Sequence, residues 1–201
     1  MRLLTFTVVL LSACTQPGVG VFVTQSGNPN GGDWGGLAGA DAECTARAAA
    51  AGLPDHTWRA YLSTVEGPVH ARDRIGVGPW LNAEGVEVAS SVEDLHSGPS
   101  SVAFLDEFGQ PAANGGPPGR EHDILTGSTV DGMVDPRGRT CADWTSQSPN
   151  DSAVVGHHDW EVFINSDWLE SWNQVHAAPC DRPGMERQLG SGRLYCFAVF
   201  E

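Results

Sequence analysis

The chain contains 201 residues, and its 25 acidic and 11 basic residues give a formal net charge of −14 at pH 7. Every basic residue apart from histidine is an arginine. A surface this acidic repels phosphate backbones and sulfated polysaccharides, which argues against nucleic acid and heparin as partners. The residues that follow a leader, about 190 in number, suffice for one domain with a well-buried core.

The first residues have the features of a bacterial export signal. Arg2 precedes an apolar run from Leu3 to Leu11. This run is shorter than the ~20 apolar residues that span a bilayer, and its length fits the core of a signal peptide. It leads into the motif Leu-Ser-Ala-Cys, which ends at Cys14 and resembles a lipobox. The alternatives are an ordinary secretory signal cut nearby and a start codon assigned at the wrong position.

The lipobox resemblance implies that residues 1–13 are removed and that Cys14 receives acyl chains. Residues 14–20 would then be a tether, and residues 21–201 one folded domain that its lipid anchor attaches to a membrane without spanning it. Thr15 follows the cysteine, at a position where an aspartate would favour the inner membrane. We therefore expect an exported, lipid-anchored protein of the bacterial cell envelope, at the outer membrane.

The first part of the domain is predicted to be a strand followed by a helix. Residues 21–24 (VFVT) are β-branched and aromatic, as in a strand, and residues 27–36 form a turn-rich loop. The alanine-rich stretch 39–54 predicts a helix, with Asp41 and Glu43 in a first turn where the helix dipole favours acidic side chains. A glycine and a proline at the end of this stretch stop the helix.

Further short strands and one capped helix follow. Residues 57–63 (TWRAYLS) alternate like a half-buried strand, and residues 78–89 indicate a strand, a turn and a second strand. Ser91 begins a short helix, and an acidic residue three positions later favours a capping box. Residues 98–156 are loop-rich with scattered short strands, and residues 193–200 (RLYCFAVF) form a buried strand. This order of elements predicts the α+β class.

Four cysteines remain when the lipidation site is set aside: Cys44, Cys141, Cys180 and Cys196. An even number in an exported chain predicts two disulfides. Four cysteines allow three pairings, and the residues alone leave all three open. No two of these cysteines are spaced as Cys-x-x-Cys, so their spacing does not indicate a zinc site.

Several spaced segments resemble the C-type lectin-like fold and, within it, the endostatin-type branch. They are GLPDHTWRAYLST (52–64), ARDRI (71–75), LTGSTVDGMVDPRGRTCADWTSQSP (125–149) and RLYCFAVFE (193–201). The opening VFVT…GNPNGGDWGGLAGADAEC looks even more like a family of spirochaete-type bacterial lipoproteins related in fold to endostatin. The resemblance extends from the first predicted strand to the end of the chain.

This resemblance implies short antiparallel strands, two helices and long loops held by two nested disulfides. It also selects one pairing of the cysteines. Cys44 on the first helix would bond Cys196 on the last strand, and Cys141 would bond Cys180 inside that loop. The inner bond would hold the irregular loops on which a ligand site would lie.

The calcium-dependent sugar site of C-type lectins rests on two motifs, which this chain carries in altered form. Its SPND and WNQ segments have Ser148 and Gln174 where the family motifs have carboxylates. Asn150, Asp151 and Asn173 still offer oxygens. Calcium prefers roughly six to eight oxygen ligands, several of them carboxylates, so the two replacements predict that no calcium is held. A calcium-linked sugar site that survives them is the alternative.

Tryptophans near the second motif offer a calcium-free way to bind a sugar. Trp160, Trp168 and Trp172 lie in a loop-rich segment and not in a periodic core pattern. Large aromatic side chains usually fill small cores, which is the simpler interpretation. If they are exposed, these tryptophans would form a stacking surface for a carbohydrate beside Asn and Asp side chains.

Histidines are the remaining candidate ligands for a metal ion. The segments REHDI and GHHDW contain three of the seven histidines, and each segment also contains an aspartate. Adjacent residues of a strand point to opposite faces, so His157 and His158 would not share one ion. No His-x-x-x-His spacing occurs, and the histidines that hold zinc at the free N-terminus of endostatin have no counterpart here. We therefore expect no metal ion and no other cofactor.

The sequence does not indicate an enzyme. It lacks the Gly-x-Ser-x-Gly elbow of many hydrolases, and paired cysteines cannot act as thiol nucleophiles. The sequence predicts a non-catalytic module that binds or adheres to an extracellular ligand, either a carbohydrate or a matrix protein. An extracellular hydrolase of unrecognised type and a purely structural envelope lipoprotein are the alternatives.

Overall fold

The computed structural model describes residues 18–97, 104–112, 121–158 and 171–200. Within them, helices pack on a central sheet, which confirms the α+β class. The strands are β1 (Val21–Val23), β2 (Trp58–Ala60), β3 (Trp80–Leu81), β4 (Glu87–Ala89), β5 (Asp123–Leu125), β6 (Ser152–His157), β7 (His176–Pro179) and β8 (Gly190–Ala198). The helices are α1 (Gly36–Ala50), α2 (Val92–His96), α3 (Cys141–Trp144) and α4 (Arg182–Arg187), with a 3₁₀ turn at Ala71–Asp73. No helix among these residues is both long and apolar enough to cross a membrane.

β8 is the centre of the main sheet, whose strands run in the order β1-β8-β5-β6-β7. β1 pairs antiparallel along one side of β8, while β2 (antiparallel) and β5 (parallel) share its other side. β6 and β7 continue the sheet beyond β5, so β7 is its edge strand among the described residues. All of β8 is buried, because other strands pair with both of its edges and both faces of the sheet around it are covered.

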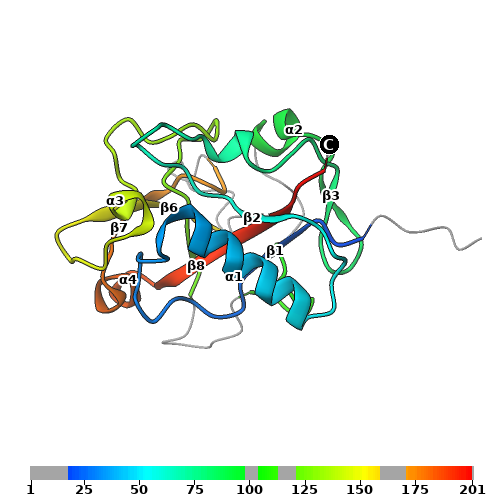
Figure 1. Cartoon of the computed structure of the whole chain (residues 1–201), viewed down its shortest axis with the longest axis horizontal. Helices are drawn as coiled ribbons and strands as arrows, with labels where there is room; N and C mark the ends of the chain where they lie inside the picture. Colours follow the sequence, from blue (N-terminus) through cyan, green and yellow to red (C-terminus); the bar gives the residue numbers. More distant parts are fainter. Residues whose placement is uncertain (1–17, 98–103, 113–120, 159–170, 201) are drawn as a thin grey trace, which may run out of the picture.

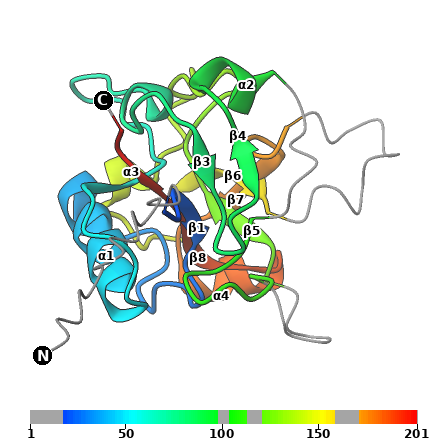
Figure 2. The ribbon, with the colours of Figure 1, turned by 90° about the vertical axis from the view of Figure 1, so that its right-hand side faces the viewer.

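Two clusters of side chains form the core on the two faces of the sheet. On one face, α1 presents Ala40, Cys44 and Ala48, which are spaced four residues apart and pack against β2 and β8 (Figure 1). The other face carries an aromatic cluster that includes Trp80 and Trp172. Figure 2 shows α1 and the β3–β4 hairpin on different sides of β1 and β8.

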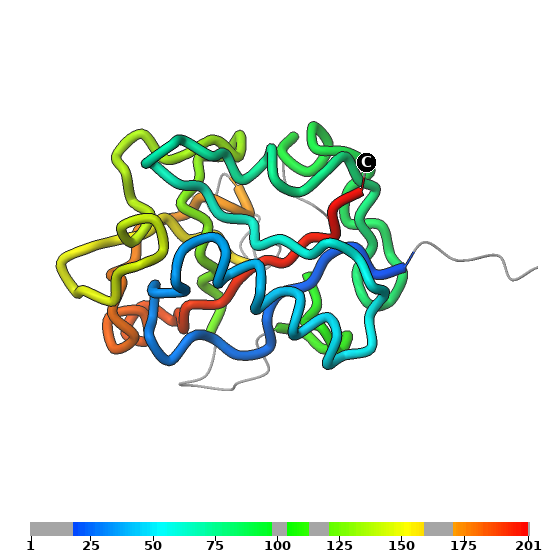
Figure 3. The backbone as a smooth tube through the Cα atoms, in the orientation of Figure 1, coloured from blue at the N-terminus to red at the C-terminus, as the bar shows by residue number. Residues whose placement is uncertain are grey.

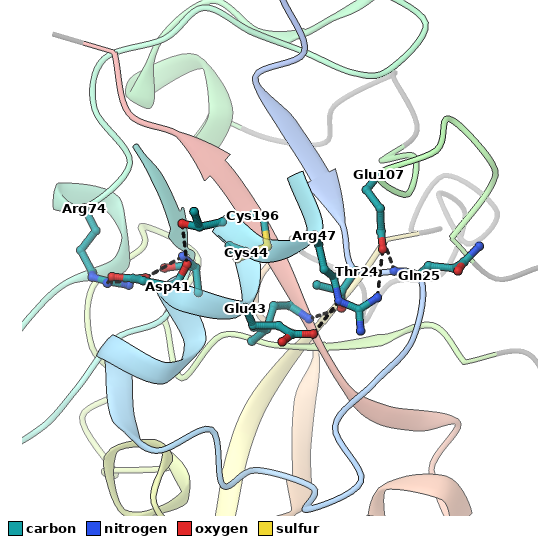
Figure 4. Close-up of a disulfide and its surroundings, with 12 residues drawn as sticks. Thr24, Gln25, Asp41, Glu43, Cys44, Arg47, Arg74, Glu107 and Cys196 are labelled. Carbon is teal, nitrogen blue, oxygen red and sulfur yellow. Dashed lines mark hydrogen bonds and ion pairs between the residues drawn. A yellow bond between two sulfur atoms is a disulfide. The ribbon is translucent and has the colours of Figure 1, made fainter. Parts of the chain in front are cut away.

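Both disulfides have the nested pairing that the family resemblance implies. Cys44 of α1 bonds Cys196 of β8 across 152 residues, with Cα atoms 5.5 Å apart (Figure 4). Cys141 bonds Cys180 across 39 residues. The inner bond joins the segments of α3 and α4, which lie at the same end of the molecule (Figure 3). The predicted pairing is confirmed.

α1 begins at Gly36, three residues before the predicted start, so Asp41 and Glu43 lie inside the helix and not in its first turn. That part of the prediction is wrong because the helix starts earlier than predicted. Asp41 instead makes a tertiary contact. Its carboxylate accepts hydrogen bonds from the Ala60 N–H at 2.9 Å and from the Arg74 guanidinium at 2.6 and 2.8 Å (Figure 4). These bonds tie α1 to β2 and to the segment that follows it.

α3 is a single turn of left-handed helix. Its four residues have φ between 50° and 69°, in a region that costs roughly 1–2 kcal/mol for each residue other than glycine. Cys141 is held by its disulfide and Trp144 is buried. The Asp143 carboxylate accepts hydrogen bonds from the backbone N–H groups of Val65 (2.7 Å) and Glu66 (2.9 Å). Tertiary contacts therefore maintain a backbone that its local sequence does not favour.

Candidate metal centre

Trp172 belongs to the core and does not form an exposed platform. Its indole N–H donates to the Leu95 carbonyl at 2.8 Å. Its ring packs against Tyr61, Phe104 and Tyr195, with ring centroids 4.8, 5.2 and 5.0 Å away. The indole is buried, so it offers no face on which a sugar could stack.

The two residues after Trp172 fasten neighbouring loops. The Asn173 amide nitrogen donates to the Tyr61 hydroxyl at 2.7 Å and to the Thr129 carbonyl at 3.0 Å. The Gln174 side-chain oxygen accepts a hydrogen bond from the Val130 N–H at 2.7 Å. The polar groups of this lectin-like motif are therefore used inside the fold.

The structure does not bring the predicted ligand residues into one site. Asn150 and Asp151 lie just before β6, whereas Asn173 packs beside Gly156 near the other end of that strand. β6 has six residues and spans about 20 Å at about 3.3 Å per residue. The predicted site residues Cys14, Trp160 and Trp168 lie outside the described residues, so their roles stay predictions.

Four other side chains converge where β5 begins, β6 ends and β7 begins. Asp123 lies opposite His157 in the register of β5 and β6. His176 pairs with Val155, two residues from His157, so His157 and His176 share one face of the sheet. His122 immediately precedes β5 and stacks its ring on that of His157, with centroids 4.1 Å apart.

The three imidazoles direct their Nε2 atoms at one carboxylate oxygen. Asp123 Oδ1 lies 3.5 Å from His122 Nε2, 3.0 Å from His157 Nε2 and 3.4 Å from His176 Nε2. The Nε2 atoms of His157 and His176 are 3.3 Å apart. Donors about 2.0–2.1 Å from a tetrahedral Zn²⁺ are roughly 3.3–3.4 Å from one another, because a tetrahedron's edge is about 1.63 times its radius. These four separations are close to that edge, and His122, Asp123 and His157 form a group of converging donors that could hold a metal ion, with His176 beside Asp123 and His157.

Asp123 occupies the buried end of the cluster. Among the described residues, neither of its carboxylate oxygens accepts a hydrogen bond of ordinary geometry, although the imidazoles of His157 and His176 lie close enough to interact with it as donors. A buried carboxylate in this state is unfavourable unless a positive charge compensates it. Gly190 of β8 leaves space for the Asp123 side chain, since a Cβ atom at position 190 would lie only 3.0 Å from the Asp123 Cβ.

The electrostatics of the cluster favour a charged carboxylate. Burial raises the pKa of the Asp123 carboxyl, but the imidazoles of His157 and His176 outweigh burial and bring that pKa below its usual value. The Asp123 carboxylate in turn raises the pKa of His176, against the opposing effect of burial. An anionic oxygen surrounded by imidazole nitrogens is a donor set that suits a divalent transition metal.

The donor set also discriminates between metals. Three imidazole nitrogens and one carboxylate oxygen suit Zn²⁺ and its first-row neighbours. Calcium requires several more oxygen ligands than this cluster supplies. A calcium ion is therefore a poor fit to this cluster, whose members His122, Asp123 and His157 form the one group of converging donors among the described residues.

Sequence reasoning recognised the two histidine-containing segments but did not join them. His122 and Asp123 come from REHDI and His157 from GHHDW, and only the pairing of β5 with β6 brings them together. His176 was missed because its segment was interpreted through the lectin motif. The expected separation of the adjacent histidines agrees with the structure, since only His157 belongs to the cluster. A search for histidines and acids at the same end of predicted neighbouring strands would have found the group.

A separate cleft of about 690 Å³ lies between the loops around Asp106 and the segment that contains Arg182. Arg193, which also lines it, pairs with Glu121 at 3.0 Å. Arg182 pairs with Glu186 at 2.7 Å. Because these arginines are already neutralised within the chain, the cleft itself does not indicate the chemistry of a ligand.

Neither the protein-family models nor the curated proteins compared with this chain match it.

Proposed function

We propose that this chain is an exported, lipid-anchored protein of the bacterial cell envelope that binds a zinc ion. The ligands are Asp123 Oδ1 and the Nε2 atoms of His122, His157 and His176. One observation carries the proposal: Asp123 Oδ1 lies 3.0–3.5 Å from three imidazole Nε2 atoms, and His122, Asp123 and His157 converge closely enough to hold a metal ion. The anchor is Cys14, proposed from the lipobox.

An internal hydrogen-bond network explains the arrangement less well. Three Nε2 atoms lie within 3.5 Å of the single oxygen Oδ1 of Asp123 without ordinary hydrogen-bond geometry, while the Nε2 atoms of His157 and His176 are within hydrogen-bond distance of each other. A carboxylate in a purely hydrogen-bonded network would use both of its oxygens. A cation among the donors would account for three imidazole nitrogens gathering at one carboxylate oxygen.

A shell of four protein ligands would favour binding over catalysis, whereas His122, Asp123 and His157 alone would leave one position open. Catalytic zinc sites typically have three protein ligands and keep a position open for water or substrate. Four protein donors complete a tetrahedral shell, so no water is activated while all of them are bound. The alternative of an unrecognised hydrolase would need one of the four to be absent from the shell.

A C-type lectin-like fold of the endostatin type remains part of this proposal. The nested disulfides and the α+β architecture support it. Recognition of a carbohydrate or matrix protein also stays a prediction, now without Trp172 and Asn173 as its contact residues. The proposed metal site depends neither on the lectin-like fold assignment nor on recognition of a carbohydrate or matrix protein.

Calorimetry with the full chain purified in detergent tests the zinc site. After treatment with a chelator, the wild type should bind one equivalent of Zn²⁺. Asp123→Ala and His157→Ala should weaken binding at least 100-fold, because each removes a buried ligand. His56→Ala is the matched control, since His56 lies outside the cluster and packs on Phe200. Equal zinc binding by the wild type and His157→Ala would refute the proposed function.

A further inference from the structure

The four ligands of the proposed centre differ strongly in their exposure. The side chains of Asp123, His157 and His122 are 1%, 7% and 12% exposed, whereas that of His176 is 36% exposed. The cluster therefore has a buried inner part and one ligand at the surface.

The inner ligands are fixed by their surroundings. The rings of His122 and His157 stack with an interplanar angle of 16°. Asp123 is buried and lies beside Gly190 of β8, where an added Cβ would stand 3.0 Å from its own Cβ. Any movement of these three side chains would disturb the packed interior of the sheet.

His176 is held less firmly. It begins β7, the edge strand of the described sheet, which lies at one end of the molecule in Figure 1. Its Nδ1 is 3.4 Å from the Ala177 carbonyl, beyond the ~2.7–3.2 Å of an ordinary hydrogen bond. Ligand histidines are usually oriented by such a second bond, so His176 lacks a strong support. It also lines a cavity of about 350 Å³, together with Gln174 and Arg137.

We propose that His176 is the exchangeable ligand, and that an imidazole from another polypeptide replaces it when the ion is loaded or released. This inference rests on the proposed zinc function and adds a partner, a metal donor or acceptor protein with an accessible histidine. In the exchange, one metal–nitrogen bond to His176 breaks as one to the neutral incoming imidazole forms. Charge and protons therefore stay balanced, and the ion keeps at least three ligands.

The chemistry of the partner's ligand follows from the site and its compartment. An incoming imidazole is equivalent to the group that it replaces. A carboxylate would be repelled by a chain with a net charge of −14. Free thiolates are scarce in the oxidising compartments to which exported proteins are delivered. A histidine side chain is thus the ligand that best fits the exchange.

Cobalt substitution makes the fourth ligand visible, because four-coordinate Co²⁺ absorbs visible light far more strongly than six-coordinate Co²⁺. We expect Co²⁺-loaded His176→Ala, as the full chain in detergent, to lose most of the wild-type absorption. A blocked tripeptide with a central histidine should restore it, and a trialanine peptide should not. His157→Asn should not be restored by either peptide, because a peptide cannot reach that buried position. His122→Ala is a second inner variant with the same expected result.

Metal removal gives an independent readout. A chelator should take the ion from His176→Ala about 10–100-fold faster than from the wild type, the scale expected when support of a metal site is lost. The inference is overturned if His176→Ala binds no Co²⁺, if the histidine peptide has no effect, or if it restores the inner variants equally. Each of these results leaves the zinc proposal intact when the wild type binds. A wild type without a Co²⁺ spectrum would refute both.

Discussion

Asp123 and His157 lie directly opposite each other in β5 and β6, and this register places the Asp123 carboxylate 3.0 Å from the His157 imidazole. Backbone pairing of the two strands, and not the flexibility of long side chains, therefore sets the spacing of two proposed ligands. A site built this way is preorganised, because the hydrogen bonds of the sheet fix the ligands before any ion arrives.

Zinc should stabilise the folded chain. At a free Zn²⁺ concentration of 100 times Kd, linkage adds about 2.7 kcal/mol to the free energy of unfolding. For a chain of this size this corresponds to a rise in Tm of about 5–10 °C. Differential scanning calorimetry should show this rise for the wild type and at most a small one for Asp123→Asn. An equal rise in both proteins would locate the zinc elsewhere.

Replacing Gly190 with alanine should weaken zinc binding. The added Cβ would lie 3.0 Å from the Asp123 Cβ and 3.5 Å from the Met185 carbonyl, so the carboxylate must shift. We expect Gly190→Ala to lower zinc affinity at least tenfold in calorimetric titrations. Val154→Ala, on the same sheet but outside the cluster, is the control. Unchanged affinity in Gly190→Ala would show that Asp123 does not need its present position.

The Asp143 carboxylate should be essential to the left-handed turn. Asp143→Ala removes two charge-assisted hydrogen bonds to the backbone N–H groups of Val65 and Glu66, and we expect a loss of about 2–4 kcal/mol. Asp143→Asn keeps one acceptor oxygen and should lose less. Urea unfolding, followed by tryptophan fluorescence, measures both variants. Equal stability of Asp143→Ala and the wild type would mean that the disulfide alone holds α3.

Asp135 should contribute to stability in a pH-dependent way. The Arg139 guanidinium, which binds it at 2.8 Å, lowers the pKa of the Asp135 carboxyl. A lowered folded-state pKa means that the contribution is present above the unfolded value of about 3.9 and is lost as pH falls through the folded pKa. The stability difference between the wild type and Asp135→Asn should be constant above about pH 5 and shrink in more acidic solution. If the stability difference between the wild type and Asp135→Asn grew as the pH fell, the pKa of Asp135 would be raised by folding and the prediction would be wrong.

Cys14 should determine membrane attachment. In a bacterial host, Cys14→Ser should move the protein from the membrane fraction to the soluble fraction, because a chain without acyl groups has no anchor. Cys44→Ser, which removes a disulfide but not the lipobox, is the control. Fractionation with immunoblotting measures the distribution, and a membrane-bound Cys14→Ser protein would contradict lipidation.

Much of the fold was predictable because its signals are local. The alanine body of α1, the Ser91 cap of α2 and the apolar run of β8 each specify one element, and the structure contains all three. β6 was not predicted because Ser152–His157 is buried on both faces and so lacks polar alternation. α4 was missed because its first residues, Arg182-Pro-Gly, resemble a turn.

The candidate site was predictable only in its parts. The sequence shows two histidine-containing segments, which contribute His122, Asp123 and His157. These residues converge only because β5 pairs with β6, and local sequence patterns do not predict which distant strands pair. The prediction that the 172–174 motif has lost its calcium chemistry rested on missing charges. The structure adds that the Asn173 side chain of this motif already forms hydrogen bonds inside the fold, with the Tyr61 hydroxyl and the Thr129 carbonyl.

The position of β8 has a consequence for the order of assembly. β8 follows every strand that pairs with it, and it also carries Cys196, the partner of Cys44. A chain whose synthesis has not yet reached β8 thus lacks the strand that β1, β2 and β5 require. The sheet can therefore close only when nearly all of these 201 residues have been synthesised.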